Sequence, residues 1–206
     1  MSAERNGIIW YCKKIGKNNK KIIKEFLLKK NYAHLDTYKM DGLQVKSWNS
    51  LEKNYRYLVK VYKHYIKFFP KTKISKIHGD FTLDNIIFNK KNIFIIDWEF
   101  FYSRKNYRYY DLAYLFLSSL CLPYIAKNRI SLKDEKLFLN LWRLLLKLKV
   151  NKKIISNPFI FFEKNIREDK SLKKNYALSK SKFFPFITKK DYKKRVLNLI
   201  KKELFK

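Results

Sequence analysis

Three polar side chains near the middle of the chain have the types and the spacing that phosphate chemistry needs. Asp80 and Asn85 lie within the run HGDFTLDN at residues 78–85, and Asp97 ends the next apolar run. Phosphoryl transfer requires one carboxylate beside the attacking hydroxyl and oxygen ligands that hold Mg²⁺ near the phosphates. A loop that carries Asp80 and Asn85 can place both around one pocket, so this set predicts phosphoryl transfer.

The segment between Asn85 and Asp97 predicts the hairpin that returns the chain to this pocket. Residues 86–88 and 93–96 are apolar and read as two short strands, and the polar residues 89–92 read as the turn between them. A single acid more often closes a turn or caps a helix. The ordered set favours chemistry, with Asp80 orienting or deprotonating the acceptor and with Asn85 and Asp97 holding Mg²⁺.

These motifs resemble the aminoglycoside phosphotransferase and choline/ethanolamine kinase superfamily, which has a protein-kinase-like fold. The triplet His-Gly-Asp at residues 78–80 is typical of aminoglycoside phosphotransferases, and Ile-Asp-Trp-Glu at 96–99 is similar to the later acidic motif. Asn-Tyr-Arg at 106–108, followed by Asp111, resembles choline and ethanolamine kinases, although the distance from Asp97 is slightly longer than usual there. The resemblance extends over residues 77–116 and favours the choline-kinase-like branch.

The resemblance implies an α+β fold, mostly helical, equivalent to the C-terminal lobe of a kinase, with the hairpin delivering Asp97. It implies ATP as phosphate donor, Mg²⁺ as cofactor and a small-molecule hydroxyl as acceptor. Choline or ethanolamine, another amino-alcohol, a sugar and an aminoglycoside all remain open as acceptors.

The resemblance also implies supporting roles for other residues. Asp111 is expected to open a buried helix as its N-cap and to brace the catalytic loop, and His78 is expected to brace the same loop. A cationic acceptor would be held by acidic and aromatic side chains, for which the candidates are Glu99, Tyr102, Tyr107 and Trp142. The simpler interpretation of the aromatic candidates is structural, because Trp142 lies in an apolar helical stripe and tyrosine is abundant throughout the chain.

The part of the chain before His78 lacks the features of a kinase N-terminal lobe. The chain has four glycines and no glycine-rich phosphate loop, and Lys46 reads as a solvated lysine. We therefore divide the chain into a helical N-terminal segment, residues 1–49, and a kinase-like C-terminal lobe, residues 50–206. The missing lobe could be encoded separately, omitted by a wrong start site or lost, and in the last case the chain would be an inactive remnant.

Apolar periodicity predicts the remaining elements. Helices are expected at residues 20–32, 50–69, 131–150 and 191–205, with Ser50 and Ser131 as N-caps and Pro70 as a stop signal. The apolar run 112–126 contains Pro123 and is too short to cross a bilayer, so it predicts a buried helix.

The net charge of +31, from 48 basic and 17 acidic residues, supports an alternative function. Such a chain would attract nucleic acid or an anionic membrane surface. The lysines are spread along the sequence and no nucleic-acid-binding motif is visible, so specific nucleic-acid binding is not favoured. Peripheral membrane contact through the basic C-terminal helix stays open. Two distant cysteines and the lack of a signal peptide favour a cytoplasmic location.

Overall fold

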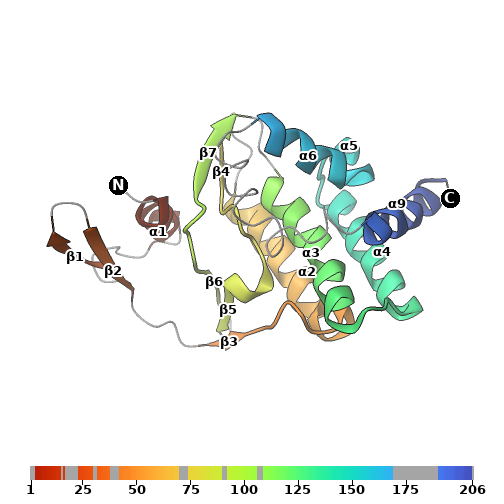
Figure 1. Cartoon of the computed structure of the whole chain (residues 1–206), viewed down its shortest axis with the longest axis horizontal. Coiled ribbons are helices and arrows are strands. Elements are labelled where there is room, and N and C mark those ends of the chain that lie inside the picture. Colours follow the sequence, from red (N-terminus) through yellow and green to blue (C-terminus); the bar gives the residue numbers. More distant parts are fainter. Residues whose placement is uncertain are drawn as a thin grey trace.

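The computed structural model describes residues 3–14, 16, 23–29, 32–37, 42–69, 74–89, 92–105, 109–168 and 190–205. Within them the fold is α+β and mostly helical, as the sequence predicted. Helices α2 (Leu51–Phe68), α3 (Tyr110–Lys127) and α4 (Leu132–Lys147) form the centre. Helices α5 (Lys152–Ser156), α6 (Pro158–Glu168) and α9 (Lys190–Leu204) lie on one side of them, and α1 (Ala3–Lys14) and the strands lie on the other (Figure 1).

The described strands pair only in antiparallel fashion. Strands β3 (Leu43–Gln44), β5 (Ile86–Asn89) and β6 (Asn92–Ile95) form one sheet in that order, and β4 (Ile74–Ile77) pairs with β7 (Tyr102–Lys105). The expected hairpin before Asp97 is confirmed, with Ile86 opposite Ile95 and Asn89 opposite Asn92. The sheet therefore brings the end of β6 to the start of β5.

The prediction of a helix at residues 20–32 is wrong. This segment contributes strand β1 (Ile23–Lys29), which pairs with β2 (Tyr32–Thr37) in a hairpin that stands apart from the other strands (Figure 1). Short apolar runs fit both helical and strand periodicity, and a pairing partner directly downstream decides in favour of the strand. The division of the chain at residues 49 and 50 stays a prediction, although α1 and β3 both contact the remainder of the fold.

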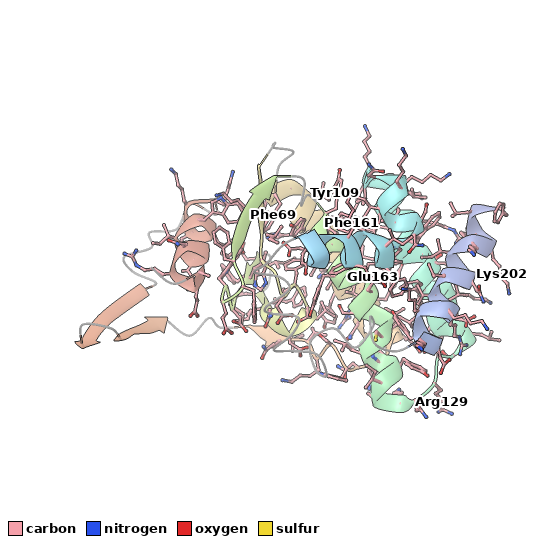
Figure 2. The ribbon with its side chains drawn as sticks, turned by 45° about the horizontal axis from the view of Figure 1, so that its top comes forward. Phe69, Tyr109, Arg129, Phe161, Glu163 and Lys202 are labelled. Carbon is pink, nitrogen blue, oxygen red and sulfur yellow. The ribbon has the colours of Figure 1, made fainter. Side chains whose placement is uncertain are left out.

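Helices α2 and α4 begin where the sequence predicted. The side chain of Ser50 accepts a hydrogen bond from the backbone N–H of Lys53, and Ser131 forms a reciprocal capping box with Asp134. The apolar face of α2 includes Leu58 and Tyr62, both fully buried. Phe69 follows the end of α2 and lies on the side of the strands (Figure 2), where its ring stacks on that of Tyr65 at 3.9 Å.

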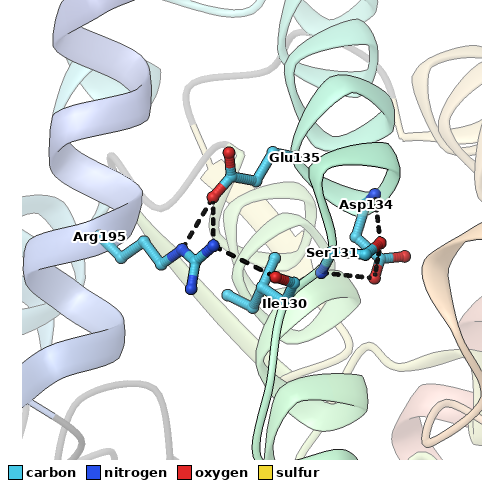
Figure 3. A network of polar contacts seen from close by, with 5 residues as sticks. All are labelled: Ile130, Ser131, Asp134, Glu135 and Arg195. Atoms are coloured by element: carbon cyan, nitrogen blue, oxygen red, sulfur yellow. Dashed lines mark hydrogen bonds and ion pairs between the residues drawn. The ribbon is translucent and has the colours of Figure 1, made fainter.

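Arg195 of helix α9 connects that helix to the start of α4. The guanidinium of Arg195 pairs with Glu135 at 2.6 Å and donates to the backbone oxygen of Ile130 at 3.2 Å, next to the capping box (Figure 3). This network connects α9 to the start of α4, at the opposite side of the molecule from α1 (Figure 1).

Helix α3 is buried on all sides from Tyr110 to Pro123 and continues through Pro123 without ending there. Within the part of the chain that the structure describes, no helix has both the length and the apolar character needed to cross a membrane. The N-cap of α3 is Tyr109, with a left-handed φ of 73°, so the assignment of Asp111 as N-cap is wrong. Asp111 lies in the first turn, and its carboxylate is used elsewhere.

The carboxylate of Asp111 joins three elements in the core. One oxygen accepts from the hydroxyl of Tyr65 at 2.7 Å and from the backbone N–H of His78 at 2.8 Å, and the other accepts from the N–H of Gly79 at 3.0 Å. Burial raises the pKa of Asp111, and the positive charge of His78 and the hydrogen bonds counteract this effect. The interaction connects α3 to α2 and to the loop after β4.

We predict that Asp111→Ala strongly destabilises the protein. The change leaves three buried donors without an acceptor, and each costs about 1–3 kcal/mol, so we expect the free energy of unfolding to fall by roughly 3 kcal/mol or more. Urea denaturation followed by circular dichroism measures this loss. The control is Asp134→Ala, which removes a half-buried carboxylate from the first turn of α4 and should cost about 1 kcal/mol. Equal losses would contradict the role of Asp111.

Candidate active site

Asp80 and Asn85 contact each other directly within the loop between β4 and β5. The side-chain nitrogen of Asn85 donates to the backbone oxygen of Asp80 at 2.8 Å and to its carboxylate at 3.2 Å. A short 3₁₀ turn, Leu83–Asn85, closes the loop and places Asn85 beside Asp80. The five-residue spacing therefore allows the side chain of Asn85 to hold that of Asp80 in place by a hydrogen bond.

The carboxylate of Asp80 lies at the edge of the core, against helix α3. Burial raises its pKa, and a hydrogen bond from the hydroxyl of Tyr114, the charge of His78 and the amide of Asn85 lower it in turn. The negative charge of Asp97 raises it again, so the two carboxylates are close enough to repel each other. A cation between them would relieve that repulsion.

Asp97 is held near this loop through the residue before it. The backbone N–H of Ile96 donates to the backbone oxygen of Asn85 at 3.0 Å, and the backbone oxygen of Ile96 accepts from Nε2 of His78 at 2.7 Å. Asp97 itself is exposed and has a left-handed φ of 60°, which is uncommon for a residue with a side chain. The loop from β4 thus fixes the backbone that presents Asp97.

Gly79 permits the close approach of the two loops. Its φ is 93°, and an added Cβ would lie 2.5 Å from the backbone oxygen of Phe100 and 2.6 Å from the Cβ of Phe100. Both the conformation and the space therefore require glycine at this position. The middle residue of the His-Gly-Asp triplet thus allows the turn after Asp97 to pack on the loop between β4 and β5.

The donor set fits Mg²⁺. The side-chain nitrogen of Asn85 is occupied by Asp80, so the atom that Asn85 offers to a ligand is its amide oxygen, and Asp97 offers an exposed carboxylate. Mg²⁺ is typically held by one or two protein oxygens together with waters and substrate phosphates. Among the described residues, no cluster of three or more His, Cys, Asp or Glu side chains forms a dedicated metal cage. The arrangement suits a metal shared with a nucleotide.

The other candidates for substrate binding differ in their positions. Glu99 is exposed two residues after Asp97. Trp142 is buried in the core, with its indole N–H donated to the backbone oxygen of Ile155 at 2.9 Å, so it does not reach a substrate from solvent. The backbone of Tyr102 belongs to β7 but its side chain lies outside the described part, and Tyr107 lies outside the described residues altogether.

Two residues near the site were missed by sequence reasoning. Tyr114, which donates to Asp80, lies three residues after Asp111 on α3, and helical spacing from Asp111 is the signal that could have found it. Tyr11 of α1 contacts β6, more than eighty positions away in the chain. No local pattern indicates such a contact.

The comparison with protein families agrees with this geometry. Residues 44–136 match the family described as "Phosphotransferase enzyme family". No curated protein and no solved structure matches the chain. The matched segment runs from the end of β3 into the first turns of α4, and it extends the resemblance seen at residues 77–116 in both directions. The superfamily resemblance is thereby confirmed, because the matched residues 44–136 include the His-Gly-Asp loop and the hairpin that ends at Asp97.

Proposed function

We propose that the protein is an ATP- and Mg²⁺-dependent phosphotransferase that acts on the hydroxyl of a small molecule. The observation that carries this proposal is the connection among Asp80, Asn85 and Asp97. Asn85 holds Asp80 through its side chain and holds the backbone before Asp97 through its carbonyl. If Asp80, Asn85 and Asp97 served only to cap turns, they would not need to be connected to one another in this way.

In this proposal Asp80 orients the acceptor hydroxyl and accepts its proton while the oxygen attacks the γ-phosphorus of ATP, with ADP as the leaving group. Tyr114 and Asn85 keep the Asp80 carboxylate in place by hydrogen bonds. Mg²⁺, bound by Asn85 and Asp97, would neutralise charge on the phosphates. In this proposal the protein supplies a general base and the ligands of a metal ion, and the loop between β4 and β5 positions both.

The acceptor is proposed from the choline-kinase-like motif and from the local charge. Glu99 is exposed near Asp97, and the charges of both raise the pKa of Glu4 in addition to the effect of burial. This acidic surface favours a cationic acceptor such as choline, ethanolamine or another amino-alcohol, with aminoglycosides and sugars as further candidates.

The proposal also includes a separately encoded N-terminal lobe, which would cover the phosphates of ATP, and a cytoplasmic location. The competing hypothesis is an inactive remnant of such an enzyme.

We predict that the chain binds ATP only weakly without Mg²⁺ and more tightly with it, and that Asp97→Asn removes the difference. Loss of even an outer-shell partner of a metal ligand typically costs 10–100-fold in affinity, so we expect a loss of at least about tenfold. Isothermal titration calorimetry with and without Mg²⁺ measures the effect.

The Mg²⁺ dependence is the control against non-specific attraction by the chain's +31 charge. A lysine-rich surface prefers free ATP, because it carries more negative charge than MgATP. The matched variant is Asp191→Asn, which removes an exposed carboxylate at the start of α9 and changes the net charge equally. Binding that Asp97→Asn retains in full would contradict the metal site.

We also predict that Asp80→Ala abolishes phosphoryl transfer while the protein remains folded. A positioned general base contributes about 10²–10⁴-fold to a rate, so transfer should fall at least about a hundredfold. Release of ADP with choline, ethanolamine, an aminoglycoside or a sugar as acceptor measures the rate, and circular dichroism checks the fold. Undiminished transfer by Asp80→Ala would refute the assigned chemistry.

A further inference from the structure

Helix α1 contacts the segment before Asp97 through one hydroxyl group. Strand β6, which leads to Asp97, lies at the edge of the sheet β3-β5-β6, and an edge strand leaves backbone groups unpaired. The hydroxyl of Tyr11 donates to the backbone oxygen of Ile93 at 3.1 Å and accepts from the N–H of Ile95 at 3.1 Å. The hydroxyl of Tyr11 thus satisfies two backbone groups of β6 that a neighbouring strand would otherwise satisfy.

Helix α1 also contacts the segment after Asp97. The buried indole of Trp98 donates to the backbone oxygen of Ile95 at 3.0 Å, and its ring lies 5.1 Å from that of Tyr11. Gly7 makes the contact possible, since an added Cβ would lie 2.6 Å from the Cβ of Trp98 and 2.8 Å from that of Phe101. The helix therefore lies against the turn at residues 98–101 more closely than a side chain at position 7 would allow.

The first turn of α1 also borders the acidic surface of the site. The carboxyl of Glu4 is near enough to Asp97 and Glu99 for their charges to raise its pKa, after the larger effect of burial.

We propose that Tyr11 is a positioning residue, whose hydroxyl holds β6 so that Asp97 is presented to the metal at the candidate site. Asp97 has a left-handed backbone, and such a conformation persists only where the surrounding structure holds it. The catalytic loop holds Ile96 from one side, and α1 holds Ile95 from the other. This inference rests on the proposed function, and it assigns to α1 a role that the family motifs do not contain.

The test is Tyr11→Phe, which removes the hydroxyl and keeps the ring. We expect the Ile95 amide to exchange with deuterium roughly tenfold faster, as the loss of one hydrogen bond implies, and MgATP affinity to fall by a similar factor. Exchange is measured by NMR and affinity by calorimetry. The indole N–H of Trp142, which is bonded within the helical core, should keep its exchange rate and so report that the fold is intact.

The matched control is Tyr192→Phe. This change removes another buried hydroxyl, which donates to the backbone oxygen of Leu117 at 2.6 Å between α9 and α3, and it should leave both Ile95 exchange and MgATP affinity unchanged. A second variant, Gly7→Ala, displaces α1 while keeping the hydroxyl, and it should weaken MgATP binding in the same way.

The outcomes separate this inference from the proposed function. If wild-type protein binds MgATP and Tyr11→Phe binds it equally well, the positioning role is overturned and the proposed function stands. If Tyr192→Phe weakens binding as much as Tyr11→Phe does, the effect is general destabilisation and the inference is again overturned. A wild-type protein that binds no MgATP contradicts the proposed function and this inference together.

Discussion

The candidate site depends on one carboxylate that is buried in the helical core. Asp111 accepts hydrogen bonds from the backbone of His78 and Gly79, and this contact fixes the start of the loop between β4 and β5 relative to α2 and α3. The imidazole of His78 then holds the peptide of Ile96, and Ile96 precedes the exposed Asp97. A buried charge is costly unless it is fully hydrogen-bonded, and here its three donors include two backbone groups of the loop that it positions. The same hydrogen bonds of Asp111 therefore stabilise the helical core and fix the geometry of the candidate site.

Local sequence rules predicted the elements that local forces determine. The hairpin before Asp97 follows from two apolar runs around a polar turn, and the start of α2 follows from the cap at Ser50. The motif residues of the site were likewise readable, because Asp80 and Asn85 interact within one loop. The error at residues 20–32 arose because a short apolar run has no unique periodicity. The contact of Tyr11 with β6 was beyond prediction, since it joins distant parts of the chain through tertiary packing alone.

The charge distribution gives the site a distinct electrostatic character within a very basic protein. Acidic residues number 17 against 48 basic ones, yet Asp80, Asp97 and Glu99 fall within a single stretch of twenty residues, and α1 brings Glu4 next to it. The overall positive field would attract an anionic nucleotide, while the local carboxylates would retain a cation. These two effects act together on a metal–nucleotide complex. A surface that only bound polyanions would have no use for the acidic cluster.

The central claim is that the His-Gly-Asp loop and the hairpin end form one binding site for a metal–nucleotide complex. The most direct measurement is paramagnetic broadening of the backbone amide signals by Mn²⁺ with ATP, followed by NMR. We expect the signals of residues 79–85 and 96–99 to disappear first, while those of α9 at the opposite side persist. Broadening that is centred elsewhere, or spread evenly over the lysine-rich surface, would contradict it.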